Sequence, residues 1–505
     1  MKLKGLVYLV GAGPGDAGLL TLRGAELLQR ADVVIYDLLV NPALLRFTRP
    51  DAERISRGRR TEFSQEQIND LLVAKAREGK IVVRLKGGDP YIFGRGAEEI
   101  ETLAAAKIPF EVVPGVSSVI AAPAYAGIPI THRDHCSSFT VFTGHSDSAN
   151  AATALHYEQI AKIPGTKIVL MGTENLDDWT KALVSHGMSP ETPVAVVQWG
   201  TRGKQKSAIG TLATIAAAVK QKKMSPPALA VIGNVVKLRD KLNWFEHRPL
   251  FGQRVVVTRA RGQASGFLEK LSGLGAEVLE VPAIKTVEPT RREDIVDALL
   301  SLNSYDWLVF TSVNGVATFF ELFFRRFQDL RDIGGAKIAA VGSATADRLR
   351  ALHLQVDVIP SDYVGHKIAE AMAKESSLEN ARVCLLRAEV ASPDLPRALE
   401  QQGAIVDDIG IYKTVAETEN HFGAADDLTE HGADWVTFTS GSTVEFFHAR
   451  FNLPKLLKRF PQLKIASIGP ETSKAIRALK LEPTVEAREH TSAGLLAAML
   501  GHVAG

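Results

Sequence analysis

The chain has 505 residues, of which 23% are charged and 46% are hydrophobic, and its net charge is +2. This balance is typical of a folded protein with several domains, excludes an intrinsically disordered chain, and argues against a nucleic-acid-binding protein. The two cysteines, Cys136 and Cys384, form neither a metal-binding nor a disulfide pattern, so we expect no metal site and a reducing compartment, the cytoplasm.

The first half alternates short β-branched runs with helical patterns, which predicts α/β layers with mainly parallel strands. The predicted strands are residues 6–10, 33–36, 81–85, 110–113, 139–143, 167–171, 194–198 and 229–233. Glycines and polar residues follow several of these strands, at the sheet edge where open α/β folds bind ligands. The apolar run 118–130 contains two prolines and is too short to cross a membrane, so we expect no membrane partner.

Two glycine-rich turns follow predicted strands. Residues 84–96 read R-L-K-G-G-D-P-Y-I-F-G-R-G, a composition that predicts a backbone-lined binding site, in which Asp89 accepts hydrogen bonds from ligand hydroxyls. The earlier turn, V-G-A-G-P-G-D-A-G at 10–18, departs from the dinucleotide pattern G-x-G-x-x-G, because its third glycine position is Asp16 and Pro14 lacks an N–H. We therefore do not expect NAD.

The second half is an internal duplication that follows a charged and aromatic connector at residues 237–252. The segment 254–260 matches 382–388, 310–312 matches 438–440, and 285–286 matches 413–414, all at an offset of 128 residues. A fourth match, 341–345 with 468–472, is slipped by one residue. The repeat predicts two similar α/β lobes.

Residues 1–245 resemble uroporphyrinogen-III C-methyltransferase, of the tetrapyrrole methylase family. The motifs that carry the resemblance are G-A-G-P-G-D-A-G-L-L-T-L, V-I-Y-D, R-L-K-G-G-D-P-Y-I-F-G-R-G, V-P-G-V-S-S and I-P-I-T-H-R-D. It implies a two-lobed fold and two methyl transfers from S-adenosylmethionine to uroporphyrinogen III, giving precorrin-2 for the cobalamin or sirohaem branch. It also implies small-molecule tetrapyrrole substrates and a homodimer formed through this half.

The resemblance further implies roles for individual residues. Asp37 is expected to be the base that takes a proton from the substrate, the alternatives being a helix N-cap or a structural salt bridge. Arg59, where some relatives have lysine, and Arg133 are expected to hold substrate carboxylates. Met171 contacts the cofactor or fills the core. The expected cofactor contacts are Pro14, Gly87, Gly88, Asp89, Ile92, Ser117, Ser118, Met171, Gly200 and Ala228.

Residues 246–505 resemble uroporphyrinogen-III synthase. The motifs are V-V-V-T-R-A, F-T-S-V-N-G-V, A-V-G-S-A-T-A, I-Y-K-T, F-T-S-G-S-T-V and I-G-P-E-T-S. The resemblance implies two interleaved lobes, about 252–286 plus 413–502 and 287–412, and cyclisation of hydroxymethylbilane to uroporphyrinogen III with inversion of the last ring. The alternative for this half is a tetrapyrrole-binding module without catalysis.

Tyr412 is the candidate acid of the second half, because the equivalent position of the first repeat holds Ile284. Its alternative role is packing at a strand edge. Hydroxyls in turns that open helices are expected to bind substrate carboxylates or to cap their own helices. These residues are Thr311, Ser312, Ser343, Thr345, Ser440 and Thr472.

Overall fold

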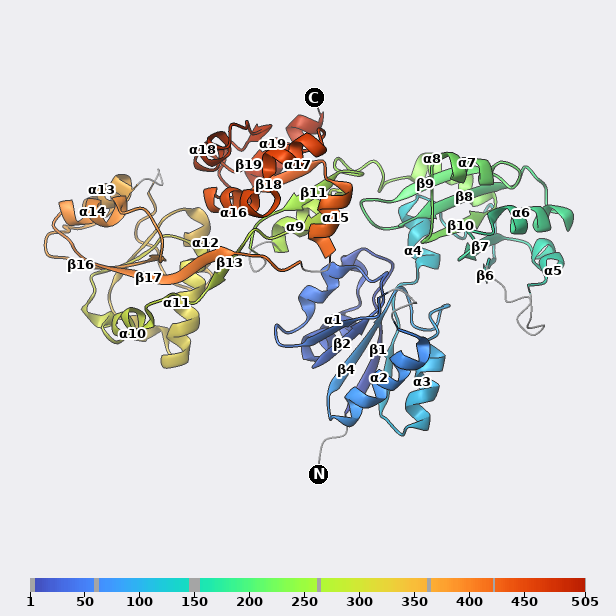
Figure 1. The fold of residues 1–505 in the computed structure, drawn as a ribbon, viewed down its shortest axis with the longest axis horizontal. Coiled ribbons are helices and arrows are strands. Elements are labelled where there is room, and N and C mark those ends of the chain that lie inside the picture. The colour runs from blue at the N-terminus through green and yellow to red at the C-terminus, as the bar shows by residue number, and fades with distance from the viewer. Residues whose placement is uncertain are drawn as a thin grey trace. The chain divides into compact units, whose positions relative to one another are not determined.

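The computed structural model describes residues 5–58, 63–144, 155–260, 265–360, 365–420 and 423–504. The chain divides into two compact units, one of residues up to Val255 with Glu269–Val278, the other of Val256–Leu268 and Leu279–Val503. Each unit combines helices with two sheets (Figure 1). No helix in the described ranges is long and apolar enough to cross a membrane.

The first sheet has the order β3-β2-β4-β1-β5, and all its neighbouring strands run parallel. Its strands are β1 (Leu6–Gly11), β2 (Val33–Tyr36), β3 (Glu53–Ser56), β4 (Ile81–Lys86) and β5 (Phe110–Val113). Helices α2 (Gln65–Arg77) and α3 (Gly96–Ala105) cover one face, and α1 (Leu22–Arg30) packs on the other. The prediction of parallel strands is confirmed for this sheet. Strand β3 was not among the predicted strands, because its sequence E-R-I-S contains a single apolar residue.

The second sheet has the order β6-β7-β10-β8-β9 and is mainly antiparallel, so the prediction of mainly parallel strands is wrong for it. Its strands are β6 (Phe139–Thr143), β7 (Thr166–Leu170), β8 (Pro193–Gln198), β9 (Lys206–Thr211) and β10 (Ala228–Ile232). An apolar run carries no direction, and a short loop without a helix joins β8 to β9, which suffices only for an antiparallel pair. The helices here are α4 (Ser118–Tyr125), α5 (Tyr157–Lys162), α6 (Leu176–Ser185) and α7 (Ile215–Gln221).

The predicted connector is folded onto the first half. It begins within a 3-10 helix (Asn234–Leu238), which α8 (Arg239–Leu242) follows. The ring of Trp244 then lies 4.9 Å from that of Tyr125. The Glu246 carboxylate accepts hydrogen bonds from Ser207 Oγ at 2.7 Å and Gln205 Nε2 at 2.9 Å, and pairs with Arg239. This segment is therefore part of the core of the first half rather than a free linker.

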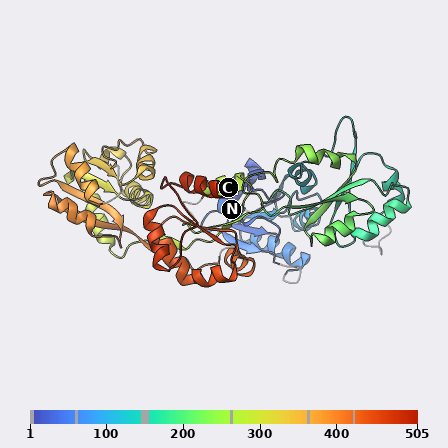
Figure 2. The same cartoon turned by 90° about the horizontal axis from the view of Figure 1, so that it is seen from above.

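The second half contains two five-stranded sheets, of order β12-β11-β18-β19-β20 and β13-β17-β16-β14-β15. The strands are β11 (Arg254–Val257), β12 (Glu277–Glu280), β13 (Ile284–Val287), β14 (Trp307–Phe310), β15 (Lys337–Ala340), β16 (Arg382–Ala388), β17 (Ile405–Ala416), β18 (Trp435–Phe438), β19 (Lys464–Ser467) and β20 (Val485–Glu486). The middle of this half, yellow to orange, forms one body, and the red C-terminal part belongs to another (Figure 2).

The duplication is visible in equivalent elements of the two lobes. Trp307 of β14 and Trp435 of β18 are both fully buried, and each strand leads into a long helix. Repeated segments also pair directly, since β13 runs antiparallel to β17 with Thr286 opposite Thr414. This confirms the two-lobed α/β fold with an internal repeat. The helices are α9 (Ser265–Gly273), α10 (Arg292–Leu300), α11 (Val313–Arg326), α12 (Ser343–Arg350), α13 (Gly365–Glu375), α14 (Asp394–Gln401), α15 (Ala424–His431), α16 (Gly441–Phe451), α17 (Leu453–Arg459), α18 (Pro470–Ala478) and α19 (Ser492–Ala504).

Candidate functional site

Three loops of the first half meet at the carboxyl ends of β1, β4 and β5. Gly13 and Gly88 exchange two backbone hydrogen bonds of 2.8 and 3.2 Å, and both have positive φ angles, +74° and +67°. A Cβ atom on Gly11 would lie 2.5 Å from the backbone of Gly115, so the loops approach closely only because these residues are glycines. The result is a rigid surface made of backbone groups.

Asp89 ties two of these loops together. Its Oδ1 accepts the N–H groups of Tyr91 at 2.8 Å and Ile92 at 3.2 Å, and its Oδ2 accepts the Gly115 N–H at 3.0 Å. The sequence predicted that this carboxylate accepts hydrogen bonds from ligand hydroxyls, and it did not predict these three contacts with backbone N–H groups. In the structure, Asp89 holds the two loops together. The side chains of Tyr91 and Ile92 remain about half exposed beside it.

The predicted residues of the second sheet lie along one edge. Met171 follows β7 and Gly200 follows β8, whereas Ala228 begins β10. Because β10 is antiparallel to both strands, Ala228 pairs with Gln198 and its neighbour Leu229 pairs with Leu170. The Met171 side chain is 51% exposed, so it does not fill the core.

Helix α4 links the edge of the first sheet that carries the glycine loops to the second sheet. Ser117 caps it by accepting the Val119 N–H at 3.2 Å, and α4 packs on the second sheet, where a Cβ on Gly200 would lie 2.4 Å from the Cβ of Ala122. Asp16, in the glycine-rich turn at residues 10–18, donates its N–H to Thr201 Oγ1 at 3.0 Å. The backbone of Gly88 thus lies close to Ser117 and Ser118, and the turn that contains Pro14 contacts Thr201, the neighbour of Gly200. The other residues predicted to hold the cofactor lie in the same loop as Gly88 (Gly87, Asp89 and Ile92) or at the same sheet edge as Gly200 (Met171 and Ala228).

Of the two predicted substrate arginines, only Arg133 lies among the described residues. Arg133 lies in the exposed turn between Thr131 and Cys136, with no hydrogen bond or ion pair to a described residue. Arg59 lies outside the described residues. Neither prediction gains support from the geometry.

Asp37, directly after β2, lies in a salt bridge. It accepts a hydrogen bond from Arg84 Nη2 at 2.5 Å, and Arg57 lies 3.7 Å away. Burial alone would raise the pKa of Asp37, but the positive charges of Arg84, Lys86 and Arg57 outweigh it and hold the pKa below its ordinary value. The side chain keeps 22% exposure, so the carboxylate is both ionised and accessible.

Sequence reasoning missed the buried partners of Asp37. Arg84 and Lys86 alternate with apolar residues in β4, and Glu99 lies on α3, all three inside the core. The available signal was the pattern R-L-K within a strand that is buried on both faces, because a charged residue is almost never fully buried without a partner.

In the second half, Tyr412 of β17 is buried with its hydroxyl 2.9 Å from Ser312 Oγ. Ser312 also caps α11 by accepting the Gly315 N–H at 3.0 Å. Burial raises the pKa of Tyr412, and hydrogen bonds with Ser312 and Asn314 offset this only in part. The phenol therefore keeps its proton through neutral pH.

The predicted hydroxyl residues fall into two groups, one on each sheet of the second half. Ser312 and Ser440 both act as helix N-caps, and Ser440 is part of a capping box with Thr443. Thr345 is buried and donates to the Val341 carbonyl at 3.3 Å. The group on the sheet that contains Tyr412 consists of Thr311, Ser312, Ser343 and Thr345, of which Ser312 contacts Tyr412, and the group on the other sheet consists of Ser440 and Thr472.

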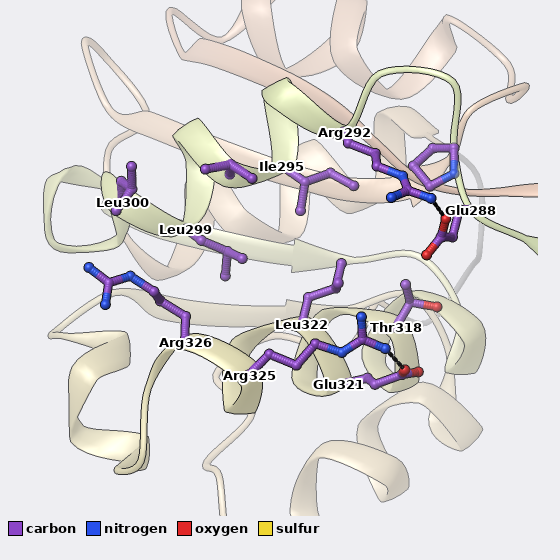
Figure 3. Close-up of a pocket in the computed structure, with 12 residues that line it drawn as sticks. Glu288, Arg292, Ile295, Leu299, Leu300, Thr318, Glu321, Leu322, Arg325 and Arg326 are labelled. Carbon is purple, nitrogen blue, oxygen red and sulfur yellow. Dashed lines mark hydrogen bonds and ion pairs between the residues drawn. The ribbon is translucent and has the colours of Figure 1, made fainter.

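A pocket of about 300 Å³ lies between α10 and α11, away from every predicted residue (Figure 3). Its walls include the apolar side chains of Ile295, Leu299 and Leu322. Ion pairs within α11 and at the start of α10, such as Arg325 with Glu321, flank it. None of the predicted catalytic or binding residues lines this pocket.

Comparison with known proteins covers both halves. Residues 6–216 match the family model for tetrapyrrole (corrin/porphyrin) methylases, and residues 265–497 match that for uroporphyrinogen-III synthase HemD. A porphyrin biosynthesis protein HemD of Ruminiclostridium josui is 38% identical over 486 residues, 95% of each chain. A uroporphyrinogen-III C-methyltransferase of Bacillus subtilis (strain 168) is 41% identical over 361 residues, 71% of this chain and 74% of that protein. An S-adenosyl-L-methionine-dependent uroporphyrinogen III methyltransferase of Methanosarcina barkeri is 50% identical over 241 residues, 47% of this chain and 94% of that protein.

Proposed function

This chain belongs to the family of fused porphyrin biosynthesis proteins in which a tetrapyrrole methylase precedes a uroporphyrinogen-III synthase, and we propose how its residues carry out the two reactions. The protein is a bifunctional enzyme. Its second half cyclises hydroxymethylbilane to uroporphyrinogen III, and its first half methylates that product twice to precorrin-2. The observation that carries this assignment is the match to a relative over 486 residues, which spans both halves.

The glycine loops fit the cofactor of the first half. S-adenosylmethionine supplies an electrophilic methyl group, so the protein has to align donor and acceptor and to exclude water. The backbone of Gly87 and Gly88 is open to a ligand, since a Cβ on either residue would meet only ordinary contacts at 3.8 Å or more. We assign the adenosyl contacts to these loops together with Ser118, Met171 and Ala228, and the role of holding the loops in place to Asp89.

Asp37 is the base in this proposal. Methyl addition to a pyrrole carbon must be followed by loss of a proton, and an ionised carboxylate at the carboxyl edge of β2 is placed to accept it. The salt bridge with Arg84 keeps Asp37 in the acceptor form at neutral pH. Arg133 and Arg59 stay proposals for carboxylate binding.

Tyr412 is the proposed acid of the synthase reaction. Hydroxide must leave the bilane before the ring closes, and a protonated phenol with a raised pKa donates a hydrogen bond to it at neutral pH. Ser312 fixes the phenol through the 2.9 Å contact. The hydroxyls of Thr311, Ser343 and the two residues on the other sheet would then bind carboxylates of the folded substrate.

Three further proposals concern the organisation of the protein. We place the boundary between the activities at about residues 247–255, slightly after the predicted boundary between 245 and 246, because Glu246 packs on the first half. We also propose a homodimer formed through the first half, as the methylase resemblance implies. The cytoplasm is the proposed compartment, on the basis of the two unpaired cysteines.

Both activities can be assayed separately with the full chain. With uroporphyrinogen III and S-adenosylmethionine it should give the dimethylated product, and with hydroxymethylbilane alone it should give the inverted isomer. If the first reaction proceeds while hydroxymethylbilane yields only the uninverted isomer, the second half is a binding module without catalysis. If neither reaction exceeds the uncatalysed rate, the assignment fails.

A further inference from the structure

A group of charged side chains lies between the first sheet of the methylase half and its covering helices, next to Asp37. We call Arg84, Lys86 and Glu99 the buried ionic cluster; their side chains are 0%, 1% and 0% exposed. Arg84 pairs in the sheet with Ile35, two residues before Asp37, so the side chains of Asp37, Arg84 and Lys86 project from the same face, and Glu99 reaches them from α3. That face is covered by α2 and α3.

Arg84 connects Asp37 to Glu99 and has no unused nitrogen. Its Nη2 donates to Asp37 Oδ1 at 2.5 Å, and its Nε donates to Glu99 Oε1 at 3.2 Å. Its Nη1 lies 3.4 Å from the carbonyl oxygens of both Ile35 and Leu85. The guanidinium is planar and rigid, so contacts on all three nitrogens fix its orientation.

Glu99 anchors this arginine from α3. Its Oε1 also accepts from Lys86 Nζ at 2.8 Å and from Gln65 Nε2 at 3.1 Å. Its Oε2 is buried without a hydrogen-bond partner among the described residues. Burial, and then repulsion from Arg84, lowers the pKa of Lys86.

Such a cluster is costly as a structural device. Removing several charges from water costs more than their attraction returns unless the geometry is excellent, and apolar residues of similar size often give equal or greater stability. The unpartnered Glu99 Oε2 adds to this cost. Its arrangement around one partly exposed carboxylate, that of Asp37, indicates a function at that carboxylate. Arg84 takes only Oδ1 of Asp37, and no described residue donates a hydrogen bond to Oδ2.

We propose that Arg84 is a positioning residue for methyl transfer, which holds Asp37 with Oδ2 turned to the substrate, and that Glu99 anchors Arg84 in that orientation. This inference rests on the proposed role of Asp37 as the base. The charged groups that face Asp37 are Arg57 after β3, Arg84 and Lys86 on β4, and Glu99 on α3.

The test uses the full chain and the pH dependence of kcat/KM for methyl transfer to uroporphyrinogen III. Activity requires ionised Asp37, so the rate rises with pH through the pKa of this carboxyl. Arg84→Gln removes a cation, which raises that pKa, and should move the acid limb to higher pH and lower kcat by about 10- to 100-fold. Glu99→Gln removes an anion, so it should lower kcat without moving the limb to higher pH.

A matched control separates positioning from loss of stability. Arg239→Gln removes another largely buried arginine, paired with Glu246 in the same half, and should lower the melting temperature while the acid limb stays in place. If Arg84→Gln does not fold, Arg84→Lys keeps the charge and loses the planar fork, so kcat should fall with an unmoved limb and unchanged binding of S-adenosylhomocysteine.

The outcomes distinguish this inference from the proposed function. An acid limb at the wild-type pH in Arg84→Gln, or full kcat in Arg84→Lys, would overturn the positioning role while methylation by the wild type still stands. Full activity of Asp37→Asn would remove the base, and with it the reason for the cluster. An inactive wild-type chain would instead refute the proposed function itself.

Discussion

Replacing Gly115 by alanine should damage the cofactor site through sterics alone. A Cβ on Gly115 would lie 2.3 Å from the Gly88 carbonyl oxygen and 2.7 Å from the Gly11 Cα, whereas ordinary contacts begin at 3.4 Å. Both neighbours are backbone atoms, so no rotamer change relieves the overlap, and the loops must separate by about 1 Å. Overpacking of this kind costs about 1–3 kcal/mol. If this cost falls on binding, affinity for the cofactor decreases by about 5- to 150-fold.

Calorimetric titration with S-adenosylhomocysteine measures this loss, and a displacement of about 1 Å should lower kcat by about 100-fold as well. Gly87→Ala is the matched control, because its Cβ would meet only the Leu39 side chain at 3.8 Å. This control should keep the melting temperature of the wild type. Wild-type affinity and melting temperature in Gly115→Ala would refute the claim that close backbone contact shapes the site.

Three other substitutions test individual roles. Asp37→Asn should keep cofactor binding by calorimetry while methyl transfer falls steeply, because the amide preserves shape and not basicity; unchanged turnover would remove Asp37 from the mechanism. Tyr412→Phe should slow ring closure and release bilane that forms the uninverted isomer, and the wild-type synthase rate should stay flat from about pH 7 to 9, because the raised pKa retains the proton. An unaltered isomer ratio would assign Tyr412 to packing. Glu246→Gln should destabilise the first half by about 3 kcal/mol at neutral pH. Hydrogen bonds from Ser207, Gln205 and Arg239 outweigh burial and lower the pKa of Glu246, so its stabilisation is present above the ordinary carboxyl pKa and is lost as pH falls through the lowered value. Urea unfolding at pH 7 and pH 3 should therefore show a large difference between variant and wild type only at pH 7.

Local patterns made much of the fold predictable. The β-branched runs at 33–36, 110–113 and 139–143 became strands with those bounds, and the offset of 128 residues correctly indicated two related lobes. Strand direction in the second sheet was not predictable, because an apolar run has the same period in either direction. Because β10 is antiparallel, its first residue, Ala228, lies at the sheet edge where β7 and β8 end. A parallel strand would have placed its last residue there.

Side-chain partners were the less predictable part of the site. The glycine-rich turns predicted a close approach of backbone segments. They did not predict the hydrogen bond from the Gly115 N–H to Asp89, because that contact joins loops 26 residues apart. A salt bridge was one of the alternative roles predicted for Asp37, but its partner, Arg84, lies 47 residues away and was not predicted. Such contacts depend on which strands become neighbours, which motif spacing does not encode.

One chain is expected to perform two consecutive reactions. The most direct test incubates the full-length protein with hydroxymethylbilane and S-adenosylmethionine and identifies the tetrapyrrole by its mass and isomer type. We expect precorrin-2, with two added methyl groups on the inverted isomer. A product without added methyl groups, or only the uninverted isomer, would contradict it.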